Sequence, residues 1–316
     1  MRAVAYSVRS FEEISLRNAN KDTHDITYIT EALGPDTVVE AEGMEAVIVF
    51  TNDDVSASVI EKLAGMGIKY ITTRSVGTDH FDKIAAEKHH IQLSNVPAYS
   101  PQAIAEHAVA LAFALNRQLI TSDHHSHNFD FRNDELIGFN FSGKTVGLIG
   151  LGNTGLAVAR IFNGLGCKVI GHDLYFPEDA TTVTAVNLET LLATADLISL
   201  HLPLTPTTKY LINKKSIAQM KKGVMLINTS RGALINTVDV LEGVMSGKIG
   251  YLGLDVYEHE KGLFFEDHQQ DAIKDDLLLR LMAQKNVLVT PHQAYLTKEA
   301  LQEIADQTIK NLDSFT

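Results

Sequence analysis

The stretch Val146-Gly-Leu-Ile-Gly150-Leu-Gly152-Asn-Thr-Gly155 decides the fold that we expect for this chain. Its first four residues form an apolar run typical of a buried strand, and the pattern over residues 156–162 predicts a helix directly after the glycines. Gly150 permits a tight turn, Gly152 lets a phosphate approach the backbone, and Gly155 permits close packing of helix on strand. The stretch therefore predicts a dinucleotide-binding unit.

The residues around this turn indicate which dinucleotide it binds. The next predicted strand, residues 168–173, ends at Asp173, about 20 residues beyond the turn, where a carboxylate accepts the ribose hydroxyls. No arginine follows Asp173 closely, which favours NAD over NADP. The amides of Asn153 and Thr154 are expected to face the phosphates at the helix N-terminus. The alternative is a glycine turn of an ordinary α/β protein with Asp173 as a solvated strand end.

Short β-branched runs alternate with helical patterns along most of the chain, which is typical of parallel α/β architecture. The strands predicted in the first part are residues 3–6, 26–29, 46–50, 69–72 and 91–93. Those predicted in the second part are residues 145–149, 168–173, 197–201, 224–228, 250–255 and 287–290. We therefore expect two doubly wound parallel-sheet domains, the first flavodoxin-like and the second Rossmann-like.

The domain boundaries are expected in two segments where the chain passes from one domain to the other. Asn95-Val-Pro-Ala-Tyr-Ser-Pro101 carries two prolines and predicts a rigid hinge. A helix rich in small residues follows over 102–117 and is interpreted as an interdomain or intersubunit helix, whereas residues 123–141 are expected to be irregular. An amphipathic helix over 297–311 is expected to return to the first domain. This predicts a discontinuous substrate domain, residues 1–99 and 294–316, with an NAD-binding domain, residues 100–293, inserted in it.

Composition excludes several classes of function. The net charge of −12 opposes binding to nucleic acid or anionic membranes, because phosphate contacts need clustered Lys and Arg. No apolar run approaches the roughly 20 residues of a membrane helix. Cys167 is the only cysteine, so no intrachain disulfide is possible and a cytoplasmic location is expected. His124, His125 and His127 cluster, but nearby only Asp123 could complete a site, so we expect a solvated helix end there and no metal.

Four residues downstream of the glycines have the chemistry of a catalytic group. Arg231 follows a predicted strand and can bind a carboxylate with two parallel hydrogen bonds. Asp255 and His292 each end a strand, where open α/β sheets bind ligands. A histidine oriented by a carboxylate can protonate the oxygen of a carbonyl group that is being reduced. Glu260 could be that carboxylate, and from the residues alone Glu258 remains an equal candidate.

At this point the chain resembles the D-isomer-specific 2-hydroxyacid dehydrogenases over essentially its whole length, and most closely the D-lactate branch of that family. The residues that carry the resemblance are Arg74-Ser-Val-Gly-Thr-Asp79, Asn95 to Pro101 with Ala105-Glu-His107, the glycine turn, Ser199 to Pro206, Asn228-Thr-Ser-Arg-Gly-Ala-Leu-Ile235, Gly253-Leu-Asp-Val-Tyr257 and Pro291-His-Gln-Ala-Tyr295. The segment 263–277 resembles an insertion typical of the D-lactate branch.

The resemblance implies a role for each matching residue. His292 matches the acid/base, Glu260 its partner, and Arg231 the residue that binds the substrate carboxylate. Substrate contacts are implied for Val76 and Gly77 through their amides, and for the side chains of Phe50, Tyr99 and Tyr295. Cofactor contacts are implied or expected for Gly150, Gly152, Asn153, Thr154, Gly155, Asp173, His201, Leu202, Pro203, Thr208, Thr229, Ser230, Arg231 and Asp255.

The expected activity is therefore NAD-dependent reduction of pyruvate to D-lactate. A dehydrogenase for larger 2-keto acids, such as phenylpyruvate or branched-chain keto acids, is the alternative within the class. A non-catalytic NAD-sensing binding protein of the same fold is the alternative from another class, since a fold alone does not fix a function. The small-residue helix favours a homodimer or homotetramer, because an exposed face of that kind would favour association.

Overall fold

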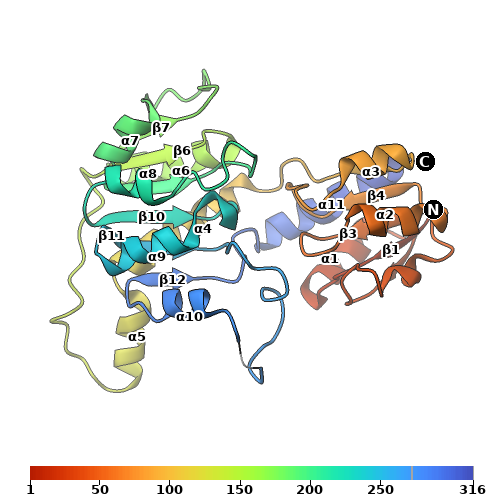
Figure 1. Cartoon of the computed structure of the whole chain (residues 1–316), viewed down its shortest axis with the longest axis horizontal. Helices are drawn as coiled ribbons and strands as arrows, with labels where there is room; N and C mark the ends of the chain where they lie inside the picture. The colour runs from red at the N-terminus through yellow and green to blue at the C-terminus, as the bar shows by residue number, and fades with distance from the viewer. Residues whose placement is uncertain (272, 316) are drawn as a thin grey trace. The chain divides into compact units, whose positions relative to one another are not determined.

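The computed structural model describes residues 1–271 and 273–315. The chain divides into two compact units, one formed by Met1–Ser100 with Tyr295–Thr316 and the other by Pro101–Ala294 (Figure 1). Each unit contains one parallel sheet with helices on both faces. The expected fold class of two doubly wound α/β domains is confirmed.

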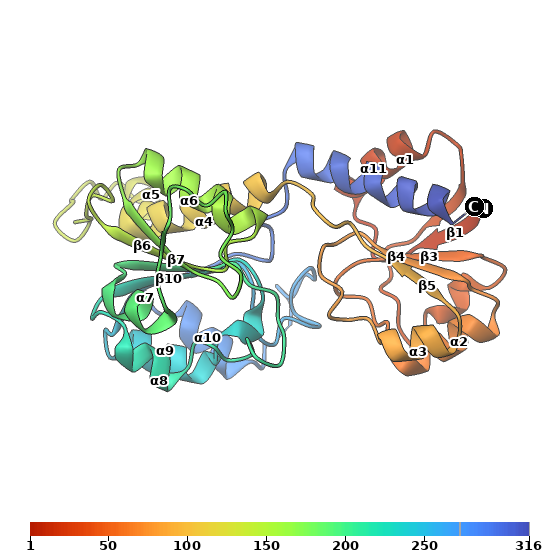
Figure 2. The same cartoon turned by 90° about the horizontal axis from the view of Figure 1, so that it is seen from above.

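The first unit has a five-stranded sheet in the order β2-β1-β3-β4-β5. The strands are β1 Arg2–Ala5, β2 Asp25–Tyr28, β3 Ala46–Val49, β4 Tyr70–Thr73 and β5 Gln92–Ser94. Helices α1 (Ser10–Asn20) and α11 (Lys298–Ser314) cover one face, and α2 (Ala57–Gly65) and α3 (Lys83–Lys88) cover the other (Figure 2). All four residues of β3 are buried, as expected for a strand covered on both faces.

Helix α11 joins the end of the chain to this first unit. The side chain of Thr297 accepts a hydrogen bond from the amide of Ala300 and begins the helix. Its buried face includes Ala305, Ile309 and Leu312, which pack against apolar residues of β1, β3 and α1.

The second unit has a seven-stranded sheet in the order β12-β11-β10-β9-β6-β7-β8. Its strands are β6 Thr145–Ile149, β7 Lys168–His172, β8 Thr184–Ala185, β9 Leu197–Leu200, β10 Val224–Asn228, β11 Ile249–Leu254 and β12 Val287–Val289. From β6 the chain adds strands in one direction across the sheet (β7, β8), and from β9 it adds them in the opposite direction (β10, β11, β12), so the strand order reverses between β6 and β9. The carboxyl ends of those two strands are the place where open α/β sheets bind ligands.

Helices cover both faces of this second sheet. On one face lie α4 (Pro101–Asn116) and α6 (Asn153–Gly164), and on the other lie α7 (Leu188–Thr194), α8 (Lys214–Gln219), α9 (Thr237–Met245) and α10 (Asp276–Met282) (Figure 2). The short 3₁₀ helices are η1 Val38–Ala41 and η2 Gly232–Leu234. Of the described helices, none combines the length and the apolar character needed to cross a membrane.

One sequence-based expectation was wrong in part, and the role of a second segment can be described more closely. Residues 123–127, expected to be irregular, belong to helix α5 (Leu119–His127), whose described residues are all at least partly exposed. The small residues of α4, including Ala105, Ala108 and Ala112, are buried against α6 within the same unit. They therefore serve close helix packing within this unit, and the interpretation of the helix as interdomain or intersubunit stays a prediction.

Candidate active site

The glycine turn has the geometry that its sequence predicts. A Cβ atom on Gly150 would lie 2.2 Å from the carbonyl oxygen of His201, and one on Gly155 would lie 2.1 Å from the carbonyl oxygen of Gly150. Both positions therefore require glycine because two backbone segments meet there. Gly152 differs, since a Cβ on it would meet no heavy atom within 4 Å. The space above Gly152 adjoins the first amides of α6, which have no acceptor within their own helix.

Asp173 follows β7 and its carboxylate is held by the backbone. One oxygen accepts from the amide of Leu151 at 2.6 Å, and the other accepts from the amide of Tyr175 at 3.1 Å. A carboxylate oxygen can accept more than one hydrogen bond, so both remain able to bind ribose hydroxyls. The two bonds fix the acid beside the glycine turn.

Buried polar atoms without a partner lie at the ends of β9 and β10. Both ring nitrogens of His201 and the hydroxyl of Thr229 lack a hydrogen-bond partner among the described residues. Burial lowers the pKa of His201 from 6.5 to about 4, so its ring is neutral at neutral pH. Buried polar groups are normally hydrogen-bonded, and these orphaned atoms fit a site that a polar ligand completes. Together with the open space at Gly152, they fit NAD.

The remaining expected cofactor residues line two ordered loops. In the loop after β9, which contains Leu202 and Pro203, the hydroxyl of Thr208 donates to the carbonyl of Pro203 at 2.7 Å. In the loop after β10, the hydroxyl of Ser230 donates to the carbonyl of Leu200 at 2.7 Å. Hydrogen bonds therefore hold both loops at the carboxyl edge of the sheet, and the bond from Ser230 ties its loop to the end of β9.

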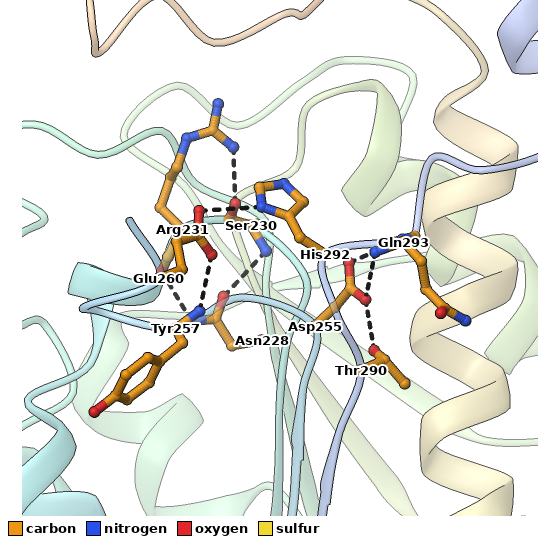
Figure 3. A network of polar contacts seen from close by, with 10 residues as sticks. Asn228, Ser230, Arg231, Asp255, Tyr257, Glu260, Thr290, His292 and Gln293 are labelled. Carbon is orange, nitrogen blue, oxygen red and sulfur yellow. Dashed lines mark hydrogen bonds and ion pairs between the residues drawn. The ribbon is translucent and has the colours of Figure 1, made fainter. Parts of the chain in front are cut away.

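Arg231 begins η2, and its backbone is tightly held. The side-chain amide of Asn228 donates to the carbonyl of Arg231 at 2.8 Å, and the guanidinium Nη1 donates to the carbonyl of Ser230 at 2.8 Å (Figure 3). A Cβ on Gly232 would lie 2.2 Å from the carbonyl oxygen of Tyr257. The loop that carries Arg231 therefore packs backbone to backbone on the segment that leads to Glu260.

His292 and Glu260 form the central pair of the site. His292 Nδ1 lies 3.1 Å from Glu260 Oε1, and Glu260 Oε2 accepts from the amide of Tyr257 at 3.1 Å (Figure 3). An ionised carboxylate can only accept, so Nδ1 carries a proton and Nε2 is the atom left to exchange one. The ring is about one-sixth exposed, which lets a small substrate reach it.

Glu258, the acid that the residues alone could not exclude, has other partners. Its carboxylate accepts from the phenol of Tyr210, and its Oε2 accepts from the hydroxyl of Thr237 at 2.8 Å. This hydrogen bond to Glu258 raises the pKa of Tyr210. The tertiary structure therefore places Glu260, and not Glu258, against His292.

Asp255 makes more contacts within the protein than its expected cofactor role suggests. Its fully buried carboxylate accepts from the hydroxyl of Thr290 at 2.5 Å and from the amides of Gln293 and Ala294 at 2.9 Å each (Figure 3). His107 Nε2 lies 3.3 Å from the same carboxylate. Sequence reasoning quoted His107 only as part of a family motif and did not single out Thr290, because no local pattern links residues that far apart.

The predicted substrate-pocket aromatics gather in the first unit. The ring of Tyr295 lies 5.8 Å from that of Phe50 and 6.2 Å from that of Tyr99. Beneath Phe50 lies the buried guanidinium of Arg74, which donates to the carbonyls of residues 6 and 7 at 3.0 Å each. Burial raises the pKa of the Tyr295 phenol. The sequence missed Arg74 as an anchor, because a buried arginine is rare.

Val76 and Gly77 follow β4 in a loop with defined hydrogen bonds. Asn95 donates its side-chain amide to the carbonyl of Val76 at 2.8 Å, and Ser75 donates its hydroxyl to the carbonyl of Gly77 at 2.8 Å. Because the carbonyl oxygens are engaged, the loop is held in one conformation, and its amides are the groups available for a ligand.

The histidine cluster lies on α5. His124, His125 and His127 are on an exposed turn, and the His127 ring contacts Asp123 of the same helix. Among residues 1–271 and 273–315, no group of three or more His, Cys, Asp or Glu side chains could hold a metal ion.

In the expected insertion 263–277, Asp275 accepts a hydrogen bond from the Tyr257 phenol at 2.8 Å and is the N-cap residue of α10. Ala272 of this segment lies outside the described residues.

The chain is similar to known proteins over its whole length. Residues 109–294 match the model of the D-isomer specific 2-hydroxyacid dehydrogenase NAD-binding domain. The chain is 42% identical to D-lactate dehydrogenase of Escherichia coli K12 over 99% of its length and 96% of that protein. The solved pyruvate reductase of Chlamydomonas reinhardtii superimposes with a TM-score of 0.93 at 41% identity, over 100% of this chain and 96% of that one.

A third relative was solved with its cofactor. The complex of Lactobacillus jensenii D-lactate dehydrogenase with NAD⁺ has a TM-score of 0.81 at 34% identity, over 100% of this chain and 97% of that one. With the glycine turn, Asp173 and the His292–Glu260 pair in place, these matches establish the family and the cofactor. The chain belongs to the D-isomer-specific 2-hydroxyacid dehydrogenases and is an NAD-dependent oxidoreductase of that family.

Proposed function

We propose that this enzyme reduces pyruvate to D-lactate, with His292 as the proton donor. The observation that carries the proposal is the 3.1 Å contact between His292 Nδ1 and Glu260 Oε1 in a chain 42% identical to a D-lactate dehydrogenase. Bound NADH supplies the hydride for the keto carbon. His292 Nε2 delivers the proton to the keto oxygen, while Glu260 accepts from Nδ1 and balances the charge of the ring when both nitrogens are protonated.

Substrate binding is assigned to two kinds of group. The guanidinium of Arg231 matches the pyruvate carboxylate in shape and charge, and the amides of Val76 and Gly77 can donate to the same kind of group. The aromatic side chains of Phe50 and Tyr295 contact the methyl group, together with Tyr99. Their bulk favours a small substrate side chain over a branched or aromatic one.

The residues at the carboxyl edge of the second sheet hold the cofactor in this proposal. The open backbone at Gly152 and the first amides of α6 bind the pyrophosphate, and Asp173 binds the adenine ribose. Neutral His201 and the hydroxyl of Thr229 face the nicotinamide half, where a neutral ring adds no positive charge.

The proposal extends to the assembly and the location of the enzyme. Large apolar side chains are exposed on α5 and the segment after it, namely Leu119, Ile120, Phe129, Phe131 and Ile137. Exposed apolar side chains along one segment of the chain favour association, so we infer a homodimer or homotetramer. We place the enzyme in the cytoplasm, where NADH and pyruvate are available.

The test is loss of NADH absorbance with pyruvate, 2-ketobutyrate, 2-ketoisocaproate, phenylpyruvate and hydroxypyruvate in parallel, followed by chiral analysis of the product. The highest kcat/KM is expected for pyruvate, with D-lactate as the product. A higher kcat/KM for a larger keto acid would keep the mechanism and overturn the substrate. Tight NADH binding without turnover of any member would instead support the NAD-sensing alternative.

A further inference from the structure

His292 has a backbone conformation that its surroundings must maintain. Its φ angle is 53°, in the left-handed region that residues other than glycine seldom adopt. Such a conformation is unfavourable for a residue other than glycine and persists only where neighbouring contacts fix it. The position of the imidazole against Glu260 depends on that conformation, because the backbone sets the direction in which the side chain leaves the chain.

Asp255 holds residues on both sides of His292, through a side-chain hydroxyl before it and two backbone amides after it. Oδ1 accepts from the Thr290 hydroxyl, two residues before it, and from the amide of Gln293, directly after it. Oδ2 accepts from the amide of Ala294. One buried carboxylate therefore closes a loop around His292.

His107 completes this arrangement from helix α4. Its Nε2 lies 3.0 Å from the Thr290 hydroxyl oxygen and 3.3 Å from Asp255 Oδ1. The Thr290 hydroxyl has one proton, which its 2.5 Å contact assigns to the carboxylate, so its oxygen must accept from His107. Nε2 of His107 therefore carries a proton and donates toward both oxygens.

The hydrogen bond from His107 is important because the Asp255 carboxylate that it reaches is buried. The side chain of Asp255 is 1% exposed and that of His107 is 17% exposed, so water contributes little to solvating the carboxylate. A buried carboxylate is stable in one orientation only when its oxygens are satisfied by fixed donors. Without the His107 donor, Asp255 and the Thr290 side chain gain freedom to reorient.

We propose that His107 is a positioning residue for proton transfer: through Thr290 and Asp255 it holds residues 290–294 in the conformation that places His292 against Glu260. The proposal rests on the proposed function, since it assigns proton delivery to His292. His107 itself touches neither of the two catalytic side chains in a described contact.

The experiment compares His107→Leu, which has no donor, with His107→Gln, whose side-chain amide can donate from a similar position. Glu106→Gln, exposed on the same helix, is the control. Purified variants are compared for kcat with pyruvate, for NADH dissociation constant by fluorescence, and for the solvent deuterium isotope effect on kcat. The leucine variant is expected to lose about tenfold or more in kcat. Its isotope effect is expected to exceed that of the wild type, because proton delivery becomes slower.

The glutamine variant is expected to recover most of the lost kcat, and NADH affinity is expected to change less than kcat in both. A folded leucine variant with wild-type kcat would overturn the proposal. So would a fall in kcat that glutamine does not recover and that leaves the isotope effect unchanged, since this is the result of a general packing defect.

A second pair keeps the test decisive if His107→Leu does not fold. Thr290→Val removes the linking hydroxyl with little change of shape, and Thr290→Ser retains it. The valine variant is expected to reproduce the loss of kcat and the larger isotope effect, and the serine variant to restore both; equal values for the two would overturn the proposal. Absence of turnover in the wild type itself would contradict the proposed function, which separates the two failures.

Discussion

Glu260 contacts His292 across 32 positions of sequence, with Oε1 3.1 Å from Nδ1, while Glu258 lies two residues away and contacts Tyr210 and Thr237. The two acids therefore have separable functions. We expect Glu260→Gln to lower kcat roughly a hundredfold, because a neutral amide does not balance the charge of a doubly protonated imidazole. Steady-state kinetics at saturating NADH and pyruvate measures the effect. Glu258→Gln is the matched comparison, and an equal or larger loss of kcat in that variant would contradict the assignment.

Arg231→Lys should weaken pyruvate binding more than NADH binding. Lysine keeps the positive charge and loses the planar pair of donors that matches a carboxylate. The loss of one charge-assisted hydrogen bond, about 1.5–3 kcal/mol, corresponds to an increase in pyruvate KM of about tenfold to a hundredfold. Kinetics at saturating NADH gives KM, and fluorescence titration gives the NADH dissociation constant. An unchanged KM for pyruvate would remove Arg231 from substrate binding.

Gly152→Ala should abolish tight NADH binding without affecting folding. A Cβ at this position meets no protein atom within 4 Å and its φ is −67°, so the apoprotein accommodates alanine. The added methyl occupies the space where the pyrophosphate approaches the backbone, and we expect the NADH dissociation constant to rise at least about tenfold. Gly164→Ala, also without a neighbour within 4 Å, is the control and should bind NADH normally. Wild-type affinity in Gly152→Ala would contradict the site.

Phe50→Leu should shift specificity toward larger keto acids. Phe50 is buried and packs 5.8 Å from Tyr295, ring to ring, so a smaller side chain enlarges the pocket that we assign to the substrate methyl. One methylene is worth about 1–3 kcal/mol in such a pocket, so the ratio of kcat/KM for 2-ketoisocaproate to that for pyruvate should rise roughly tenfold. Phe11→Leu, at an exposed position, should leave the ratio unchanged. An unchanged ratio in Phe50→Leu would place the pocket elsewhere.

The pKa of His201 predicts a specific loss of stability in acid. Burial lowers this pKa from 6.5 to about 4, so between these values the unfolded chain binds a proton that the folded protein does not. Neutral His201 therefore contributes roughly 3 kcal/mol to the free energy of unfolding above pH 6.5. This contribution decreases as the pH falls below 6.5 and is lost below about pH 4.

This contribution can be measured by urea unfolding of the wild type and of His201→Asn at about pH 7.5 and about pH 4.5. For each protein the free energy of unfolding falls between the two pH values, and the contribution of His201 is the difference between the two falls. The wild type should lose more stability than the variant. His90→Asn, at an exposed position, should behave as the wild type. Equal losses in the wild type and His201→Asn would show that His201 accepts a proton in the folded protein.

The sequence by itself determined the fold class and most of its strands. Parallel strands covered on both faces must be short and apolar, so runs such as Ala46–Val49 and Val224–Asn228 could be recognised locally. The glycine turn could also be recognised locally as a strand–turn–helix motif. The clash that excludes a Cβ at Gly155 lies within that unit, whereas the clash at Gly150 is with the carbonyl oxygen of His201, after another strand. Only the histidine end of helix α5 was predicted as helical, because the residues of α5 have no apolar periodicity that would indicate the whole helix.

Only the tertiary structure decided which side chains act together. Glu258 and Glu260 are chemically identical and almost adjacent, and the folding of β12 beside β11 brings His292 to one of them. The buried carboxylate of Asp255 has four donors, one of which is His107. These donors lie up to 187 positions apart in the sequence, from His107 to Ala294. Hydrogen bonds of this kind form between distant parts of the chain, so no local pattern of residues records them.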